Sequence, residues 1–475
     1  MATKGGQFLK RNDMTQKYDV IVIGAGMSGL AASIRLAMFG KKVVCLEKHS
    51  ISGGLNSYYR RGKRNFDVGL HALTNFAQRG DRGKPLTKLL KQLRIPWKEL
   101  ELIEQKQSKI IFPDTTLTFN NDFATLVQDI AEKFPTHIDE FNLFVEHIKD
   151  FNEVALTNET FMAKDVARKY IKNEKLISMI FAPLLIYGSA WEDDMDFSQF
   201  VIMFKSIYLE GFARPDGGVR KIINLLLDKY KDLGGELRFR ASVQSINTQN
   251  DKVTSVTLEN GEVLECEKVI SSMGHPETMS ITQGQTSQKI EVGPMTFCET
   301  ILCLDERPKD FDMNDTILFY NEREDYQYRA PSDFIDDKSA VICFPNNFAD
   351  DDNNEGLIRL TYMANYEKWK ELVNTDRKAY LAKKNEIYEQ SLKTLKTIYP
   401  NAKLDVKFKD VFTPHTIERY TGHMRGCVYG STQKLRDGRT PVNGLFLCGT
   451  DQGFLGIIGS MLSGISMANL HGLME

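Results

Sequence analysis

The sequence YDVIVIGAGMSGLAASIRLAMFGKKVVCLEK, residues 18–48, predicts a strand, a glycine turn, a helix and a second strand. Residues 18–23 are rich in β-branched types, which is typical of a buried parallel strand. Residues 28–39 have a helical pattern, and Gly40 suits the end of that helix. Residues 42–46 form the second strand, so this part of the chain indicates an α/β fold with a parallel sheet.

Three glycines between the first strand and the helix have the G-x-G-x-x-G spacing: Gly24, Gly26 and Gly29. In order, they allow the tight turn, the approach of backbone to a pyrophosphate, and the packing of helix on strand. The N–H groups and the positive dipole end of the helix N-terminus favour phosphates. Glu47, about twenty residues further on, can accept hydrogen bonds from a ribose. The context predicts a dinucleotide site, and a glycine turn without function is the alternative.

The composition indicates a protein large enough for two domains or more, with 475 residues, 42% of them hydrophobic and 26% charged. The formal net charge of −2 gives no electrostatic case for nucleic acid, so we expect no such partner. The seven cysteines are odd in number and form no C-x-x-C pair. This pattern favours a reduced, cytoplasmic compartment and gives no support for a metal site.

The sequence predicts neither a signal peptide nor a spanning helix. Residues 1–17 are polar, and we expect a loose tail there. No window has the roughly eighteen apolar residues that a spanning helix requires, which leaves attachment to a membrane surface open. Residues 198–208 are unusually apolar, with Lys205 as the only interior charge. They fit a core helix, the wall of an apolar substrate tunnel, or a face that dips into a membrane.

Further motifs carry a resemblance to a known family. GAGMSGL at 24–30 is followed by ISGGLNS at 51–57 and FDVGLHAL at 66–73. Together they resemble the flavin-dependent amine oxidase and phytoene desaturase superfamily, over nearly the whole chain. The FD-x-G-x-H element and the run GTDQGFLGIIGS at 449–460 favour the retinol saturase and carotenoid isomerase branch.

The resemblance implies a Rossmann-type FAD-binding domain of the glutathione-reductase kind, with a parallel sheet and helices, and a discontinuous α+β substrate domain. It assigns residues 18–80, 215–295 and 411–475 to the FAD-binding domain. Residues 81–214 and 296–410 form the implied substrate domain. FAD is the implied cofactor, and the oligomeric state stays open.

The implied FAD site draws on both ends of the chain. In the family, the pair at Gly53 and Gly54 lies beside the diphosphate and ribityl chain, and the backbone at Val243 meets the adenine side. Asp451 resembles the acidic residue that holds the ribityl or diphosphate region, and a capping aspartate is the alternative. The other implied contacts are Gly24, Gly26, Met27, Ser28, Gly29, Glu47, Lys48, Leu55, Ser57, Gly69, His71, Gly449 and Gly459.

His71 is the titratable residue that the resemblance places near the flavin. It is our candidate for acid or base catalysis at a double bond. A histidine that is hydrogen-bonded to backbone near the cofactor is the alternative. His415, His423 and Arg425 are weaker candidates, and Tyr187 is a candidate for an aromatic wall with a core position as its alternative.

Three functions are consistent with these motifs. The first is an FAD-dependent oxidoreductase that desaturates, saturates or isomerises carbon–carbon double bonds of a long apolar lipid, isoprenoid or polyene in an apolar tunnel. The second is a flavin amine oxidase, which requires an aromatic cage. The third is a prenyl-binding escort protein of the GDP dissociation inhibitor type, which carries no working flavin. The intact glycine motif with Glu47 and Asp451 favours an enzyme, and a single fingerprint predicts no tight NAD(P) site.

Overall fold

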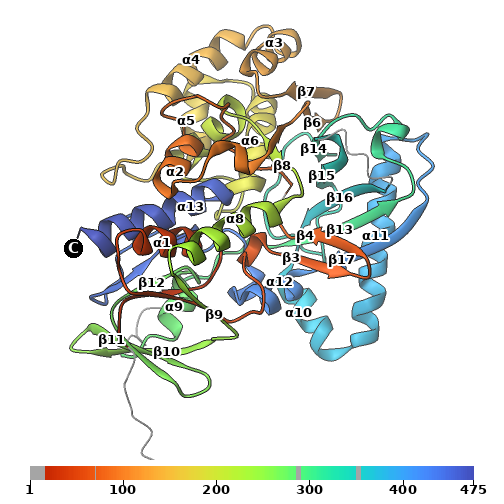
Figure 1. Cartoon of the computed structure of the whole chain (residues 1–475). Helices are drawn as coiled ribbons and strands as arrows, with labels where there is room; N and C mark the ends of the chain where they lie inside the picture. Colours follow the sequence, from red (N-terminus) through yellow and green to blue (C-terminus); the bar gives the residue numbers. More distant parts are fainter. Residues whose placement is uncertain (1–16, 70, 285–289, 349–354, 475) are drawn as a thin grey trace, which may run out of the picture.

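The computed structural model describes residues 17–69, 71–284, 290–348 and 355–474. The predicted tail lies outside the described residues except for Lys17, which begins the first strand. Two sheets and a group of helices make up the fold (Figure 1). The assignment of sequence ranges to an FAD-binding and a substrate domain stays a prediction.

The first sheet is built around the predicted N-terminal unit. Its strands are β1 (Lys17–Ile23), β2 (Val43–Glu47), β9 (Glu236–Phe239), β10 (Val243–Gln249), β11 (Lys252–Leu258), β12 (Val263–Ser271) and β18 (Leu445–Leu447). The order is β10-β11-β12-β1-β2-β9, with β18 beside β12. β1 pairs in parallel with both β12 and β2, while β10 and β11 form antiparallel pairs at one edge. The parallel centre of the sheet agrees with the predicted buried strands.

Helices cover this sheet in layers. Helix α1 (Met27–Ala37) packs against β1 and β2, and α2 (Pro85–Leu93), α8 (Val219–Asp232) and α13 (Gly456–Met467) pack against α1, while α9 (His275–Ser280) follows β12. Gly29 in α1 brings the helix onto the strand turn, because a Cβ there would lie 1.9 Å from the carbonyl oxygen of Gly24. A Cβ at Gly464 would lie 2.0 Å from the carbonyl oxygen of Ser28. Small residues therefore join the N-terminal and C-terminal helices backbone to backbone.

The second sheet is mostly antiparallel. Its strands are β6 (Ser108–Phe112), β7 (Thr115–Phe119), β13 (Phe297–Leu304), β14 (Ile317–Asn321), β15 (Ser339–Cys343), β16 (Gly356–Met363) and β17 (Val406–Phe412). Their order is β17-β13-β16-β15-β14-β6-β7. Figure 1 shows α10 (Tyr366–Thr375) and α11 (Arg377–Ile398) beside this sheet, with α12 (Pro414–Thr421) near its β17 edge.

A helical lobe forms the upper part of Figure 1. It contains α3 (Phe123–Lys133), α4 (Ile138–Asp150), α5 (Ala163–Tyr170), α6 (Glu174–Gly188) and α7 (Phe197–Phe204). Phe200, Val201 and Phe204 are fully buried, so the interpretation of residues 198–208 as a membrane-dipping face is wrong and a core helix is observed. In the described ranges, no helix is long and apolar enough to cross a membrane.

Short strands complete the fold, and one predicted strand is divided. β3 (Tyr58–Arg61) and β4 (Arg64–Asp67) form a hairpin, and β5 (Leu102–Glu104) pairs with β8 (Ala213–Pro215). The sequence of residues 237–246 predicts one strand, but the structure has two there, β9 and β10, at opposite edges of the first sheet. Arg240 between them has a left-handed φ of 54°, which ends β9 and redirects the chain.

Candidate active site

A cavity of about 840 Å³ lies where the two sheets and the helical lobe meet. The first sheet and its loops contribute Gly26 and Thr450, which lie near opposite ends of the sequence. The second sheet contributes Glu299 and Thr361, and helix α6 contributes Tyr187. Distant parts of the chain therefore share one cavity, which the prediction of a joint FAD site requires.

Most of the residues that the sequence assigns to the FAD site line this cavity. They are Gly24, Gly26, Met27, Ser28, Glu47, Lys48, Gly53, Gly54, Leu55, Ser57, Gly69, His71 and Val243. Gly29, Gly449, Asp451 and Gly459 are not among the lining residues. Of the weaker candidates, His415 and His423 line the cavity, as does Tyr187, whereas Arg425 instead pairs with Glu367 at 3.0 Å.

The glycine turn and helix α1 leave an open cradle for an anion. Gly26 precedes α1 with an ordinary φ of −72°, no side chain caps the helix, and its first turn contains no acidic residue. A Cβ at Gly26 would meet no atom within 4 Å, so the space beside it is open. Gly54 lies opposite, where a Cβ would approach the Cα of Gly26 to 3.5 Å. The N–H groups of the first turn can therefore bind a pyrophosphate.

Glu47 is fixed at the end of β2 beside this cradle. One carboxylate oxygen accepts a hydrogen bond from the N–H of Ala25 at 2.8 Å, and the other accepts from the N–H of His49 at 2.8 Å. Each carboxylate oxygen has a further lone pair, so Glu47 can still accept bonds from ribose hydroxyls. The residues present thus fit an adenine dinucleotide.

The two predicted C-terminal glycines that do not line the cavity are packed against neighbouring residues. A Cβ at Gly449 would lie 2.8 Å from the hydroxyl of Ser28, and one at Gly459 would lie 3.4 Å from the carbonyl carbon of Phe454. Gly449 also has a φ of +88°, which favours glycine. Their positions give no support for the direct cofactor contact that the resemblance implies for these two residues.

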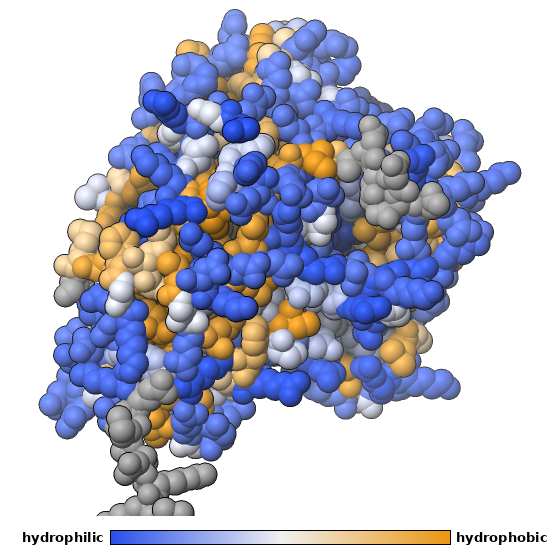
Figure 2. Space-filling view, in the orientation of Figure 1, coloured by the Kyte–Doolittle hydropathy of each residue, from blue (hydrophilic) through white to orange (hydrophobic). Residues whose placement is uncertain are grey.

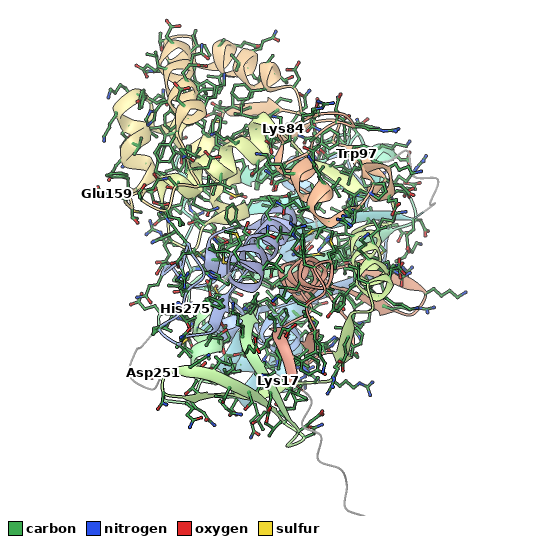
Figure 3. The ribbon with its side chains drawn as sticks, turned by 60° about the vertical axis from the view of Figure 1, so that its left-hand side comes forward. Lys17, Lys84, Trp97, Glu159, Asp251 and His275 are labelled. Carbon is green, nitrogen blue, oxygen red and sulfur yellow. The ribbon has the colours of Figure 1, made fainter. Side chains whose placement is uncertain are left out.

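Asp451 connects three segments behind the cavity. Its side chain is 1% exposed, and it accepts hydrogen bonds from the N–H of His275 at 2.6 Å and the N–H of Ser431 at 2.7 Å. Lys434 Nζ lies 3.3 Å from the same carboxylate. His275, labelled in Figure 3, begins α9 next to the first sheet. Asp451 therefore holds the loops around the cavity together, and its neighbour Thr450 reaches the wall.

His71 belongs to a buried polar cluster at the second sheet. Its Nε2 atom lies 3.1 Å from the hydroxyl of Thr361 and 3.7 Å from a carboxylate oxygen of Glu299. Its Nδ1 atom lies 3.4 Å from the hydroxyl of Tyr187. Glu299 also forms an ion pair with Arg359, and both side chains are at most 3% exposed. Thus a histidine, a tyrosine and a threonine meet at the cavity wall with an ion pair behind them.

The electrostatics of this cluster favour a neutral imidazole. Burial lowers the pKa of His71, and Arg359 and Arg214 lower it further, while Glu299 opposes the shift. Burial by itself would raise the pKa of Glu299, but Arg359 and His71 hold it below its ordinary value. Burial raises the pKa of Tyr187 well above its usual range. Near neutral pH, the cluster therefore contains ionised Glu299, neutral His71 and a protonated Tyr187.

The wall next to this cluster is largely apolar. It comes from α6, α7, β13, β15 and the segment after α12, with Ile186, Met203, Phe297, Val341, Val428 and Tyr429. The rings of Phe297 and Tyr429 meet edge to face, 5.9 Å apart. This part of the cavity can hold an apolar chain beside His71. Within the described residues, no group of three or more His, Cys, Asp or Glu side chains could hold a metal ion.

Glu299, Arg359 and Thr361 were not identified as site residues from the sequence. Glu299 interrupts the apolar strand FCETILCL, and Arg359 interrupts GLIRLTYM. A charge in the middle of an apolar strand is unusual, because a buried charge requires a partner. That signal could have identified both residues, but their pairing with His71 depends on the tertiary structure.

A family model described as flavin containing amine oxidoreductase matches residues 27–470. The chain belongs to this family. Its cofactor is FAD, and the protein is an FAD-dependent oxidoreductase. The predicted superfamily is thereby confirmed, and the open cradle at Gly26 with Glu47 beside it fits the nucleotide part of FAD.

Curated relatives of this family member match almost its whole length. The chloroplastic prolycopene isomerase of Daucus carota is 25% identical over 96% of this chain and 80% of that protein. The all-trans-retinol 13,14-reductase of Danio rerio is 22% identical over 95% of this chain and 85% of that protein. The 1-hydroxycarotenoid 3,4-desaturase of a Flavobacterium species is 23% identical over 86% of this chain and 88% of that protein.

Solved structures show the same fold. An oxidoreductase from Methanosarcina mazei superposes with a TM-score of 0.68 at 18% identity, covering 96% of this chain and all of that one. A RAB GDI from Plasmodium falciparum superposes with a TM-score of 0.54 at 14% identity, covering 97% of this chain and 99% of that one. The predicted α/β class with a Rossmann-type FAD-binding unit is confirmed. The fold is shared with a RAB GDI, so fold alone does not identify the activity.

Proposed function

We propose that this FAD-dependent oxidoreductase acts on a long apolar polyene or isoprenoid and changes a carbon–carbon double bond by desaturation, saturation or isomerisation. The observation that supports this best is the apolar wall beside the neutral cluster of His71, Tyr187 and Thr361. Relatives named for prolycopene, retinol and a hydroxycarotenoid give the substrate class independent support.

Residues at the first sheet would hold the cofactor. The N–H groups after Gly26 and the turn at Gly53 and Gly54 would bind its phosphates, Glu47 would accept the ribose hydroxyls, and Val243 would lie at the adenine side. When bound, FAD supplies hydride exchange at N5. Asp451 would act indirectly, because it fixes the loops that surround the site.

The protein's own residues would supply the proton that such reactions require. Addition or removal of hydrogen across a double bond moves one proton besides the hydride, and His71 is our proposed donor or acceptor. Its Nδ1 faces the Tyr187 hydroxyl, and both side chains line the cavity. The buried partners Glu299 and Arg359 hold the imidazole in place while the apolar wall excludes water from the reacting carbons.

The test is turnover of defined polyenes by the FAD-loaded protein. Prolycopene, all-trans-retinol and a 1-hydroxycarotenoid are incubated separately, with the flavin oxidised or reduced beforehand, and the products are separated by chromatography. We expect one of them to be isomerised, saturated or desaturated, and His71→Asn to slow that conversion by about 100-fold. Hydrogen peroxide release from putrescine, with no change in any polyene, would contradict the proposal and favour an amine oxidase.

A further inference from the structure

One section of the cavity wall is strongly basic. It consists of Arg61 at the end of β3 and of Arg377 and Lys384 in α11, and we call it the cationic wall. Arg377 and Lys384 are seven residues apart, which places them on one face of the helix. The ring of Tyr380 lies between them, 4.8 Å from the guanidinium carbon of Arg377 and 5.9 Å from Nζ of Lys384.

Within residues 17–69, 71–284, 290–348 and 355–474, few carboxylates oppose the cationic wall. Asp410 is the carboxylate that faces it, and its Oδ2 accepts a hydrogen bond from the Tyr59 hydroxyl at 3.0 Å and lies 3.8 Å from Nε of Arg61. Among the residues that the structure describes, Lys384 has no carboxylate within 4.0 Å. Burial lowers the pKa of Lys384, Asp410 opposes this, and Arg377 and Arg61 lower it further. A bound anion would relieve this repulsion between cations.

The cationic wall is separate from the cradle for the FAD phosphates. The cradle is made by α1 and the turn at Gly53 and Gly54, and Lys48 is the basic residue next to Glu47 there. The cationic wall instead lies at the β17 edge of the second sheet, where Lys384 is close enough to Cys298 to affect the pKa of its thiol. Tyr59 connects the two regions, because its pKa is raised by burial and then by the carboxylates of both Asp410, which faces the cationic wall, and Glu299 of the His71 cluster.

The surface around this region is polar. Figure 2 shows a predominantly hydrophilic face over the area where Figure 1 places α10, α11 and the β3–β4 hairpin. The interior wall formed by Ile186, Met203 and Val341 is apolar. The cavity therefore offers an apolar section and a cationic section to a single ligand.

We propose that the cationic wall binds the carboxylate at one end of an otherwise apolar substrate or product, with Lys384 as its principal contact. The inference rests on the proposed function, because the apolar chain is the part that lies beside His71. It deepens that function by naming an amphiphile with an anionic end as the ligand class. Lys384 then selects the acid over the corresponding alcohol, since charge-assisted hydrogen bonds are roughly twice as strong as neutral ones.

The test compares acids with alcohols that share one apolar chain. The pairs are all-trans-retinoic acid with all-trans-retinol and lauric acid with dodecanol, titrated into the FAD-loaded protein and followed by flavin absorbance and calorimetry. Lys384→Met removes the charge and keeps an unbranched side chain. Lys383→Met is the matched control, because Lys383 is adjacent in α11, pairs with Glu386 and is not among the lining residues.

We expect the unmodified protein to bind each acid at least about tenfold more tightly than its alcohol. Lys384→Met should weaken binding of the acids by about tenfold, with alcohol affinity and FAD content within about twofold of the unmodified protein. Lys383→Met should leave all of these values unchanged. This combination assigns the difference to one charge at the cavity wall.

Three results would overturn the carboxylate site. The first is equal affinity of the unmodified protein for acid and alcohol, and the second is an equal loss of affinity for both ligands in Lys384→Met. The third is loss of FAD from Lys384→Met, which would show that the charge of Lys384 serves the cofactor phosphates. If the retinoids do not bind but laurate binds in preference to dodecanol and depends on Lys384, the carboxylate site stands and the polyene function fails.

Discussion

Glu299 and Thr361 are direct partners across the antiparallel strands β13 and β16. This register brings both side chains to the same nitrogen of His71, 3.7 Å and 3.1 Å away. The second sheet thus fixes the position of a residue whose sequence neighbours belong to the flavin-binding motifs. Consequently, the properties of His71 depend on strands more than two hundred residues further along the chain.

The first prediction concerns the buried ion pair. Glu299→Ala leaves the guanidinium of Arg359 buried without its carboxylate, and breaking such a pair costs about 3–5 kcal/mol. We expect the free energy of unfolding of the FAD-loaded protein to fall by that amount in urea titrations. Glu140→Gln is the control, because it changes a solvent-accessible pair with His137, and surface pairs of this kind contribute little to stability. Equal stability of the two variants would refute the prediction.

The second prediction is a pH dependence of stability. The folded state holds the pKa of His71 below 6.5, with Glu299, Arg359, Arg214 and Tyr187 as the facing groups, so the unfolded chain binds more protons just below that pH. Stability should therefore decrease as the pH falls through about 6.5 toward the lower folded value. His71→Asn should show a shallower decrease over this range in parallel urea titrations. Identical slopes would show that His71 is not held neutral.

The third prediction separates two glycines of one motif. Gly26→Ala adds a methyl group in open space at an ordinary φ, so unfolding of the FAD-free protein should change by no more than about 1 kcal/mol. The same methyl group enters the phosphate cradle, and we expect at least about tenfold weaker FAD binding.

Gly29→Ala is the contrasting variant. Its Cβ would lie 1.9 Å from the carbonyl oxygen of Gly24, so α1 must shift away from the strand turn and stability must fall together with FAD affinity. Calorimetric unfolding with and without FAD measures both quantities. The cradle would be misassigned if Gly26→Ala bound FAD normally.

The fourth prediction tests the hydroxyl that faces His71. Tyr187→Phe keeps the aromatic ring in the cavity wall and removes the group 3.4 Å from Nδ1. We expect kcat to fall by about tenfold to 100-fold on whichever polyene is turned over, with KM within about threefold. Tyr326→Phe, a change at another buried tyrosine that does not line the cavity, should leave both constants unchanged. A change confined to KM would make Tyr187 a binding residue.

Local patterns predicted the N-terminal unit of the fold well. The strand, glycine turn and helix from Tyr18 to Ala37 follow from β-branched residues, glycine spacing and helical periodicity, which all act within a short segment. The Asn-Gly pair at residues 260–261 is likewise a strong local signal for a hairpin, and β11 and β12 form an antiparallel pair around it. The break at Arg240 was missed, since a non-glycine residue with positive φ has no reliable sequence signal.

The site was predictable where it depends on backbone and less so where it depends on distant pairing. The glycine turn is a property of consecutive residues, so the sequence alone could predict that Gly26 lies at the cavity, and its contact with phosphate stays a prediction. The cofactor role of Asp451 stays a prediction: the structure places its carboxylate outside the cavity wall, where it accepts hydrogen bonds from His275 and Ser431. The partners of His71 come from β13 and β16, whose register only the folded chain specifies.

The contact between Gly464 and Ser28 has a consequence for biosynthesis. Helix α13 supplies Gly456, Ile457 and Ser460 to the cavity, and it leaves the ribosome more than four hundred residues after the glycine turn at Gly26. During translation, the N-terminal glycine turn therefore emerges long before its opposite wall exists. Tight capture of the flavin nucleotide must then wait for α13, which makes the nascent chain dependent on this helix for acquiring its prosthetic group.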